Sequence, residues 1–380
     1  MDKKSLVSIA GNPAEQWATA PLSGVSAPSA VTFCAAHGIS DPRSSPIPIY
    51  ARWGVALLND SRDGAFVGLM IECAIACSCG VGLWLSHLPM LIVGPLYWAA
   101  LFGWVFDRFT LMLHCTSHRP LFRRQYRTLN HVIPWLLGPF FGQTPNTYFA
   151  HHIAMHHREE NLAQDLSTTI SFRRDGFQDW LRYYSRFMFL GLFDLASYLT
   201  NRRRFKVLKS VLIGEGCYWS VMLLLVILRP AATFVVFLGP LLFIRTLMMI
   251  GNWGQHAFVC PEQPDNAYRA SIVCVNTRYN RRCFNDGYHI LHHLQPRCHW
   301  SDHAREFERD LVTYGLNDAI VFDGLDFFQV WSCLMLHRWH VLARHFVQLP
   351  GAPARSTEEI IVLLRARVAA SSAPSAGREL

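Results

Sequence analysis

Nine of the 18 histidines in this chain fall into three short groups. The first group is an i,i+4 pair in the segment HCTSH, the second is HHIAMHH, and the third lies in YHILHH. A tenth histidine ends the segment NWGQH. The members of these groups, with the tenth, are His114, His118, His151, His152, His156, His157, His256, His289, His292 and His293.

The clustering of so many imidazoles needs an explanation. Protonated rings repel one another, and dehydrated rings lose hydrogen bonds to water. A cation that binds neutral ring nitrogens removes both costs. A single i,i+4 histidine pair arises often by chance in helices, but three dense groups do not, so the pattern predicts metal binding.

Ligand number and type indicate which metal. A zinc site uses three or four protein ligands, often with thiolate, so nine imidazoles without a cysteine cluster exceed one zinc site. Imidazole suits iron as well as zinc or copper. The Glu-x-x-His pattern of soluble di-iron bundles is missing. We therefore expect two metal ions, and a pair of irons that activates dioxygen is the favoured interpretation.

The rest of the chain must position these groups, and its composition is apolar. Of 380 residues, 51% are hydrophobic and only 16% charged. Four apolar stretches, 65–86, 88–106, 211–228 and 231–250, match the roughly 17–25 residues that cross a bilayer. Their internal charges are Glu72, Glu215 and Arg245. Short connections join the stretches in pairs, so we predict an all-α, polytopic membrane protein with four transmembrane helices in two hairpins and a cytoplasmic helical cap.

Basic residues orient these hairpins. The chain has a net charge of +8, and fourteen Lys or Arg lie between His114 and Ser210, whereas the hairpin tips carry only Arg229. The positive-inside tendency then places the tips outside and both termini, with the histidine groups, in the cytoplasm. The stretch 187–199 is short and predicts an interfacial helix. Because such a charge pattern suits membrane lipids, no nucleic-acid partner is expected.

We divide the chain into three parts. Residues 1–47 are rich in Ala, Ser, Pro and Gly and are expected to form a disordered arm without a cleavable signal peptide. Residues 48–350 form the membrane domain with its cap, in which 327–346 is predicted as one amphipathic helix. Residues 351–380 are expected to form a helix and a flexible tail. The eleven cysteines show no disulfide framework, so we expect none to be paired.

In order, spacing and topology these motifs resemble the integral-membrane fatty-acid desaturase and hydroxylase superfamily, over roughly residues 50–310. The resemblance implies a di-iron site with a defined set of ligands. They are His114, His118, His152, His156, His157, His256, His289, His292 and His293, with Asn252 as a water-mediated partner. The second group departs from the common HxxHH, because Ile153 stands three residues before His156. The longer HxxxHH form prefers His152 as its first ligand and leaves His151 as the alternative.

Carboxylates often accept the second ring N–H of a metal-bound histidine. Asp165 and Asp286 are the candidates closest in sequence to the second and third groups, with Glu159 or Glu160 as further choices. The remaining histidines are expected to lie at the surface or the membrane interface rather than bind metal. They are His37, His87, His131, His299, His303, His337, His340 and His345.

The resemblance implies that dioxygen and two electrons desaturate a fatty-acyl chain. Hydroxylation of a lipid is an alternative. A second alternative is the oxidative decarboxylation of a medium-chain free fatty acid to a terminal alkene, because RYNRRCFNDGYHILHH loosely resembles that branch. In that case Arg278, Arg281 and Arg282 would hold the carboxylate through forked hydrogen bonds. A haem- or zinc-binding membrane protein without enzymatic activity is the remaining hypothesis.

The partners follow from what the sequence lacks. It has no iron–sulfur spacing, no dinucleotide-binding glycine motif and no recognisable haem domain. Electrons must therefore come from an external ferredoxin-like or cytochrome-like donor, which Arg119, Arg123, Arg124 and Arg127 could dock. Those arginines could equally set topology and contact lipid phosphate. The expected location is a bacterial inner membrane.

Overall fold

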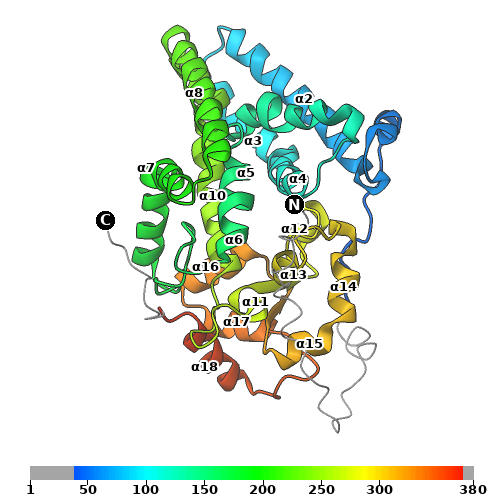
Figure 1. Cartoon of the computed structure of the whole chain (residues 1–380), viewed down its shortest axis with the longest axis vertical. Coiled ribbons are helices and arrows are strands. Elements are labelled where there is room, and N and C mark those ends of the chain that lie inside the picture. The colour runs from blue at the N-terminus through cyan, green and yellow to red at the C-terminus, as the bar shows by residue number, and fades with distance from the viewer. Residues whose placement is uncertain (1–37, 371–380) are drawn as a thin grey trace, which may run out of the picture.

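The computed structural model describes residues 38–370, and the fold is mostly helical. In Figure 1 the long apolar helices α2, α3 and α8 occupy the upper half, and the short helices α11, α15, α17 and α18 lie in the lower half. Most of the arm 1–47, including His37, and the end of the tail lie outside the described residues. The ten cysteines within the described residues are all free, as expected.

The first hairpin joins α2, Gly64–Leu85, to α3, Met90–Trp104. Its outer surface is apolar, and Leu91 is 94% exposed. The one acid in α2, Glu72, accepts a hydrogen bond from Arg108 at 3.0 Å, so its charge is paired. An apolar outer face with a paired internal charge is what a lipid environment requires.

The second predicted span is bent. After α3 the chain breaks at Val105 and turns by 49° into α4, Phe106–His118. The break frees backbone carbonyls, and the Arg282 guanidinium donates to those of Gly103 and Trp104. The bend therefore aims the first histidine pair in a direction that a straight continuation of the span would not give.

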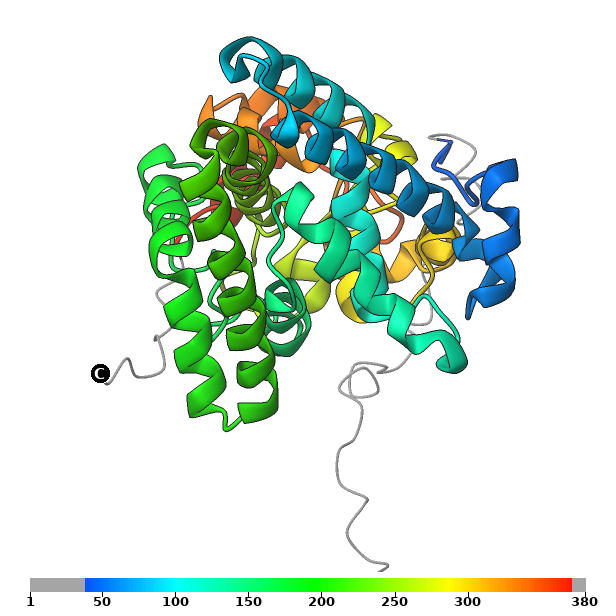
Figure 2. The same ribbon diagram turned by 90° about the horizontal axis from the view of Figure 1, so that it is seen from above.

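The second hairpin is longer than the stretches 211–228 and 231–250. Its first arm is α8, Phe205–Leu228, and its second arm runs through α9 (Pro230–Thr233), the π turn η8 (Phe234–Leu238) and α10 (Gly239–Gln255). In Figure 2 α8 lies beside the helix α7, Phe177–Asn201, and the second arm contacts α8 at the tip, through α9. The π turn precedes Pro240, which has no N–H to donate within a regular helix. Because α10 extends to Gln255, it delivers His256 at its end.

Three continuous stretches are long and apolar enough to cross a membrane, namely Ser61–Leu85, Phe205–Leu228 and Pro230–Gln255. The count reaches four when the bent pair Met90–Trp104 and Phe106–His118 is taken as one span. The helix over the predicted stretch 187–199 is α7, Phe177–Asn201, which is much longer than expected and packs against α8. It does not belong to the three continuous candidates.

The lower part contains a feature that the all-α prediction missed. Strands β1, Ile272–Val275, and β2, Ile320–Asp323, form a parallel pair with Ile272 opposite Ile320. Both strands are almost wholly buried, and the third histidine group follows β1 in the helix α13, His289–Leu294, which packs against that strand. The prediction of a purely helical fold was therefore wrong in this detail.

The predicted helix 327–346 is two helices, α16 (Phe327–Met335) and α17 (Trp339–His345). His337, between them, has a positive φ of 51°, which ends the helical path. α16 packs against α10 so closely that a Cβ on Gly254 would lie 2.5 Å from the Phe327 carbonyl oxygen. This approach ties the end of α10 to the lower part.

Shorter elements complete the fold. They are η2 (Ile49–Leu57), η3 (Ser61–Asp63), η4 (Arg124–His131), η5 (Val132–Leu137), η6 (Gly138–Phe141), α5 (Thr147–His151), η7 (His152–His156), α6 (His157–Glu159), α11 (Ala267–Ala270), α12 (Arg278–Arg282), η9 (Trp300–Asp302), α14 (His303–Arg309), α15 (Leu311–Leu316) and α18 (Thr357–Arg367).

Candidate metal centre

The structure gathers the histidine groups into two adjacent clusters. The ligand atoms within each cluster all lie within 4.8 Å of one another. The first cluster contains His114, His118, His152 and His292, and the second contains His156, His256, His289 and His293. His157 joins the first cluster, because its Nε2 lies 2.8 Å from that of His292. The nine histidines expected to act together therefore do lie together.

Four separate segments supply these side chains. α4 places His114 and His118 one turn apart on one face. The end of α10 supplies His256, and α13 supplies the third group. The second group spans the π turn η7, whose wider i→i+5 hydrogen bonding turns His152 and His157 toward the same cluster. This turn accounts for the extra residue in the HxxxHH spacing.

The structure places His152 in the first cluster and His151 outside both. The His151 ring packs edge-on against Phe187, with the ring centroids 5.7 Å apart. Its Nε2 is buried and has no hydrogen-bond partner among the described residues. His151 lines the cavity beside the clusters instead, so its position favours His152 as the predicted first ligand of the second group.

The distances between ring nitrogens fit a bound metal. Nε2 atoms are paired at 3.1 Å between His114 and His292 and at 3.2 Å between His256 and His289. Two nitrogens that bind one ion at about 2.1 Å lie roughly 3 Å apart. Imidazoles meeting at this separation without an ion can make only one hydrogen bond per pair. The donor set therefore suits metal ions better than hydrogen bonding alone.

Burial keeps the rings in their ligand form. It lowers the pKa of His289, His292 and His293 well below the usual histidine value, and the neighbouring imidazoles lower it further. Burial likewise lowers the pKa of His256, to about 3. Neutral imidazoles are the form that binds metal, so the clusters are ready to act as ligands at neutral pH.

Asp165 supports the second cluster, as its place in the sequence suggested. Its Oδ2 accepts a hydrogen bond from His156 Nδ1 at 2.7 Å, and its Oδ1 accepts from the backbone N–H of Ser167 at 2.8 Å. Burial by itself raises the pKa of Asp165, but the His156 imidazole and its hydrogen bond outweigh burial and hold the pKa at about 2. An ionised acceptor orients the His156 ring.

Asp286 lies near the first histidine pair and not against the third group, which its place in the sequence suggested. Its Oδ1 is 3.9 Å from His114 Nδ1, and it accepts hydrogen bonds from the Tyr279 hydroxyl at 2.9 Å and from Gln255 at 3.3 Å. Burial raises its pKa to about 6. Asp286 therefore faces the first cluster through His114, and not His289, which follows it in sequence.

The other acidic candidates point away from the clusters. Glu159 accepts hydrogen bonds from Tyr198 and Arg202, and Glu160 is exposed. The side-chain N–H of Asn252 donates to the Ser167 carbonyl oxygen at 3.0 Å and to the Tyr183 hydroxyl at 2.7 Å. It also lines the adjoining cavity.

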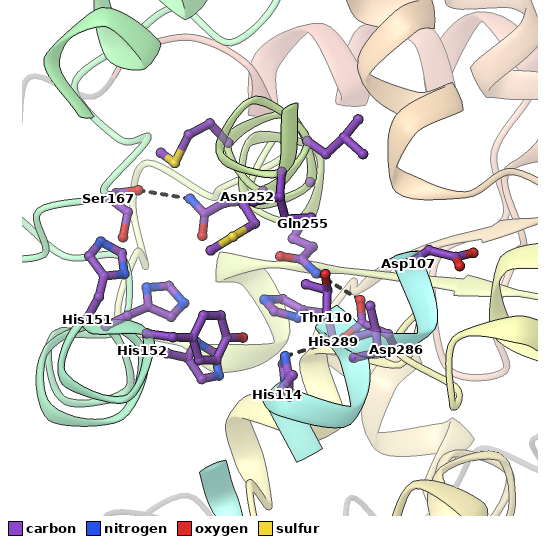
Figure 3. A pocket seen from close by; sticks show the side chains of 18 of the residues that line it. Asp107, Thr110, His114, His151, His152, Ser167, Asn252, Gln255, Asp286 and His289 are labelled. Carbon is purple, nitrogen blue, oxygen red and sulfur yellow. Dashed lines mark hydrogen bonds and ion pairs between the residues drawn. The ribbon is translucent and has the colours of Figure 1, made fainter. Parts of the chain in front are cut away.

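An apolar cavity of about 340 Å³ adjoins both clusters. Figure 3 shows it with His114, His152 and His289 gathered beneath Asn252 and Gln255. Much of its wall is aliphatic or aromatic and includes Leu111, Phe187, Ile244, Leu247, Met248, Met249 and Phe328. A flexible hydrocarbon fits such a wall, and the histidines lie where a methylene would be held.

None of the three arginines predicted to hold a carboxylate lines this cavity. Arg282 pairs with Asp107 and with backbone carbonyls at the bend, while Arg278 and Arg281 are exposed. Short helix α12 directs these side chains away from the histidines. The sequence suggested them only because they precede the third group by a few residues.

Two histidines expected at the surface are buried. His299 Nε2 lies 2.9 Å from Asp63 Oδ1, in a third group of close ligand atoms that also includes Asp60. Arg119 pairs with both aspartates, so this group already has its counter-charges. His303 Nδ1 lies 3.3 Å from the Asn285 carbonyl oxygen. Both therefore have structural partners.

Sequence reasoning missed several residues of the cavity wall. Tyr148, Gln255 and Tyr279 line it, and Gln255 and Tyr279 also hold Asp286. A signal for Gln255 was present, because it lies three residues after Asn252, on the same face of α10. Tyr148 lies four residues before His152, which was a comparable signal, whereas no such spacing marks Tyr279.

Comparison with known proteins gives one family. A family model described as "Fatty acid desaturase" matches residues 76–321, more than half of the chain, and all nine cluster histidines lie within the match. No curated protein and no solved structure gives a significant match.

Proposed function

Since the chain belongs to the fatty acid desaturase family and is a desaturase-like oxidoreductase of the membrane, we propose that it desaturates a fatty-acyl chain at a di-iron centre. One observation carries the proposal: two clusters of inward-facing imidazole nitrogens border one apolar cavity. The apolar helices and the family together make it an integral membrane protein.

We assign each iron to one cluster. The first set of ligands is His114, His118, His152, His157 and His292, and the second is His156, His256, His289 and His293. Irons bound there would supply the activation of dioxygen needed to remove hydrogen from an unactivated methylene. The reaction consumes one dioxygen, two electrons and two protons, takes two hydrogens from neighbouring carbons, and releases two waters.

The chain's own residues would position the substrate. The walls formed by Leu111, Leu247 and Met248 would hold the acyl chain by burial and exclude water. Asp165 would keep the His156 ring in one orientation through its hydrogen bond. Because the arginines of α12 do not reach the cavity, no observation favours decarboxylation next to a carboxylate held there.

The topology and electron donor are part of the same proposal. Four spans in two hairpins would place the clusters and the lower helices on the cytoplasmic side, where a ferredoxin-like or cytochrome-like donor docks. Arg119 forms an ion pair with Asp60, and Arg123 donates a hydrogen bond to the Leu58 carbonyl oxygen. Arg124 and Arg127 are exposed and make no ion pair within residues 38–370, so they are the better docking candidates.

Metal analysis of purified protein tests the centre. We expect about two irons per chain, and we expect His118→Ala and His293→Ala each to lose about one, since each removes a ligand from a different cluster. The control His131→Ala changes an exposed ring and keeps both irons. Membranes supplied with a donor should convert an acyl substrate to a product of unchanged length lacking two hydrogens.

Three results would contradict the proposal. Stoichiometric zinc or haem in place of iron would exclude a di-iron desaturase. An alcohol as the main product would mean hydroxylation, and a volatile alkene one carbon shorter would mean decarboxylation.

A further inference from the structure

A small side cavity of about 60 Å³ adjoins the main cavity. The two share Tyr148, His151, Phe187 and Met248 as wall residues. The side cavity adds polar and charged groups that the main cavity lacks, among them Thr144, Thr147, Glu215 and Arg245. A chain lying along the clusters could therefore place a polar end there.

We propose that Arg245 in this side cavity binds the carboxylate of a free fatty acid, which makes a free acid the substrate of the desaturation proposed above. The inference rests on that proposed function for the reaction, but the binding site stands on its own contacts.

Arg245 is a charge within the span Pro230–Gln255. Within residues 38–370 its guanidinium makes no hydrogen bond and no ion pair within 4.0 Å, although its side chain lines the side cavity. An ionised group at such a depth is costly unless it has a partner, and such groups are commonly functional. The cation therefore has no acid in contact with it among the described residues, and a substrate carboxylate could take that place.

Among the described residues, Glu215 is the one acid on the wall of the side cavity, and both of its oxygens accept hydrogen bonds. Its Oε1 accepts from the hydroxyls of Thr144 and Thr147, both at 2.5 Å, and its Oε2 accepts from Trp219 Nε1 at 2.9 Å. These donors hold the carboxylate away from Arg245, so Glu215 does not neutralise it by contact.

A second donor faces the same space. His151 lines both cavities, and its Nε2 is buried without a partner among the described residues. An N–H at that atom could donate to one carboxylate oxygen while the planar guanidinium donates two parallel hydrogen bonds. The unpartnered nitrogen of His151 and the unpaired guanidinium of Arg245 thus both suit a carboxylate.

The size of the side cavity limits what can occupy it. About 60 Å³ accommodates a carboxylate and a few waters, since one water needs about 10–15 Å³ of cavity volume measured in this way. The pantetheine arm of a thioester carrier or a phospholipid headgroup is several times larger. A free acid is therefore the acyl form that fits.

The face of α10 sets the distance from the carboxylate to the clusters. Arg245, Met248, Asn252 and Gln255 follow one another at i, i+3, i+7 and i+10 and all line the cavities. At about 1.5 Å per residue, Arg245 lies roughly 16 Å along the helix from His256, and its side chain leans further away, toward the N-terminus. A carboxylate held by Arg245 would then lie on the membrane side of His256, with its acyl chain entering the main cavity past Met248.

The experiment compares Arg245→Gln and Arg245→Lys with the parent enzyme. Substrates of one chain length are offered as the free acid, the methyl ester and the coenzyme A thioester. We expect the parent to prefer the free acid, and Arg245→Gln to raise KM for the acid about 10- to 100-fold, as for a charged hydrogen bond. KM for the ester should not change. Arg245→Lys should restore part of the affinity.

Binding is measured separately, by equilibrium titration of purified protein with radiolabelled free acid. Arg245→Gln should weaken binding by the same factor while both irons remain. The control Arg182→Gln, an exposed residue of α7, should change nothing. If Arg245→Gln raised KM equally for the acid and the ester, the inference would be overturned. A preference of the parent enzyme for the thioester would also overturn it. Tight, Arg245-dependent acid binding without desaturation would instead overturn the proposed reaction alone.

Discussion

The two nitrogens of a cluster imidazole have different surroundings. The Nε2 atoms face the centre of each cluster, whereas Nδ1 of His156 is bound to Asp165 and Nδ1 of His256 lies 2.8 Å from the Ala270 carbonyl oxygen. A fixed partner on one nitrogen sets which nitrogen is free to bind metal. Orientation of the rings thus depends on groups that touch no metal themselves.

Asp165→Asn tests this dependence. The amide keeps the size of the side chain but loses the charge that stabilises the His156 N–H, so we expect iron affinity to fall about 10- to 100-fold. The measurement is iron retained during titration with a chelator. Asp265→Asn is the matched control, because Asp265 is exposed and makes no side-chain hydrogen bond within residues 38–370. Equal retention by both variants would mean that Asp165 has no role in orientation.

Among the elements, α8 is positioned by one close approach. A Cβ on Gly214 would lie 2.1 Å from the Pro145 carbonyl oxygen, so only glycine lets the helix contact the segment before α5. The next residue, Glu215, then reaches the hydroxyls of Thr144 and Thr147. The contact aligns the second hairpin with the segment that carries the second histidine group.

Gly214→Ala and Gly216→Ala separate packing from helix propensity. Gly216 has open space where its Cβ would be. We expect Gly214→Ala to lower the free energy of unfolding by about 1–3 kcal/mol, because backbone must shift. Gly216→Ala should leave it unchanged or raise it by up to about 1 kcal/mol, because alanine favours helix. Thermal unfolding in detergent measures both, and similar midpoints would show that the α8 contact adapts freely.

At the scale of the whole molecule, the centre joins both halves of the fold. α4 and the end of α10 bring histidines from the long apolar helices, and α13 brings them from the part that contains β1 and β2. The tips lie at the other end, where Arg229 donates to the Trp84 carbonyl oxygen. If the helices span a bilayer, tips and clusters must face opposite compartments.

Labelling of one added cysteine at a time tests that arrangement. His87→Cys lies at a tip and Arg305→Cys in α14, and both positions are exposed. In intact cells a reagent that cannot cross the membrane should label the first, because the proposed orientation places the tip outside, and label the second only after the membrane is opened. Labelling of the parent chain sets the background. The reverse pattern would invert the proposed orientation.

The local sequence was enough to locate the apolar stretches and the histidine groups. Length and apolar composition are local properties, so 65–86 appears as α2 with little change, and the grouping of imidazoles already indicated a metal site and its family. Nearness in sequence to the second histidine group also located Asp165, nine residues from the ring that it holds.

Only the tertiary structure decided which side chains meet. The π turn placed His152 and not His151 in a cluster, and the bend at Val105 aimed α4. Each residue of β1 paired with a residue of β2 that lies 48 positions further along the chain. Asp286 faces His114 although it lies next to the third group in sequence. The physical reason is that one residue of slip rotates a helical side chain by about 100°, and contacts between distant segments depend on packing that no local pattern records.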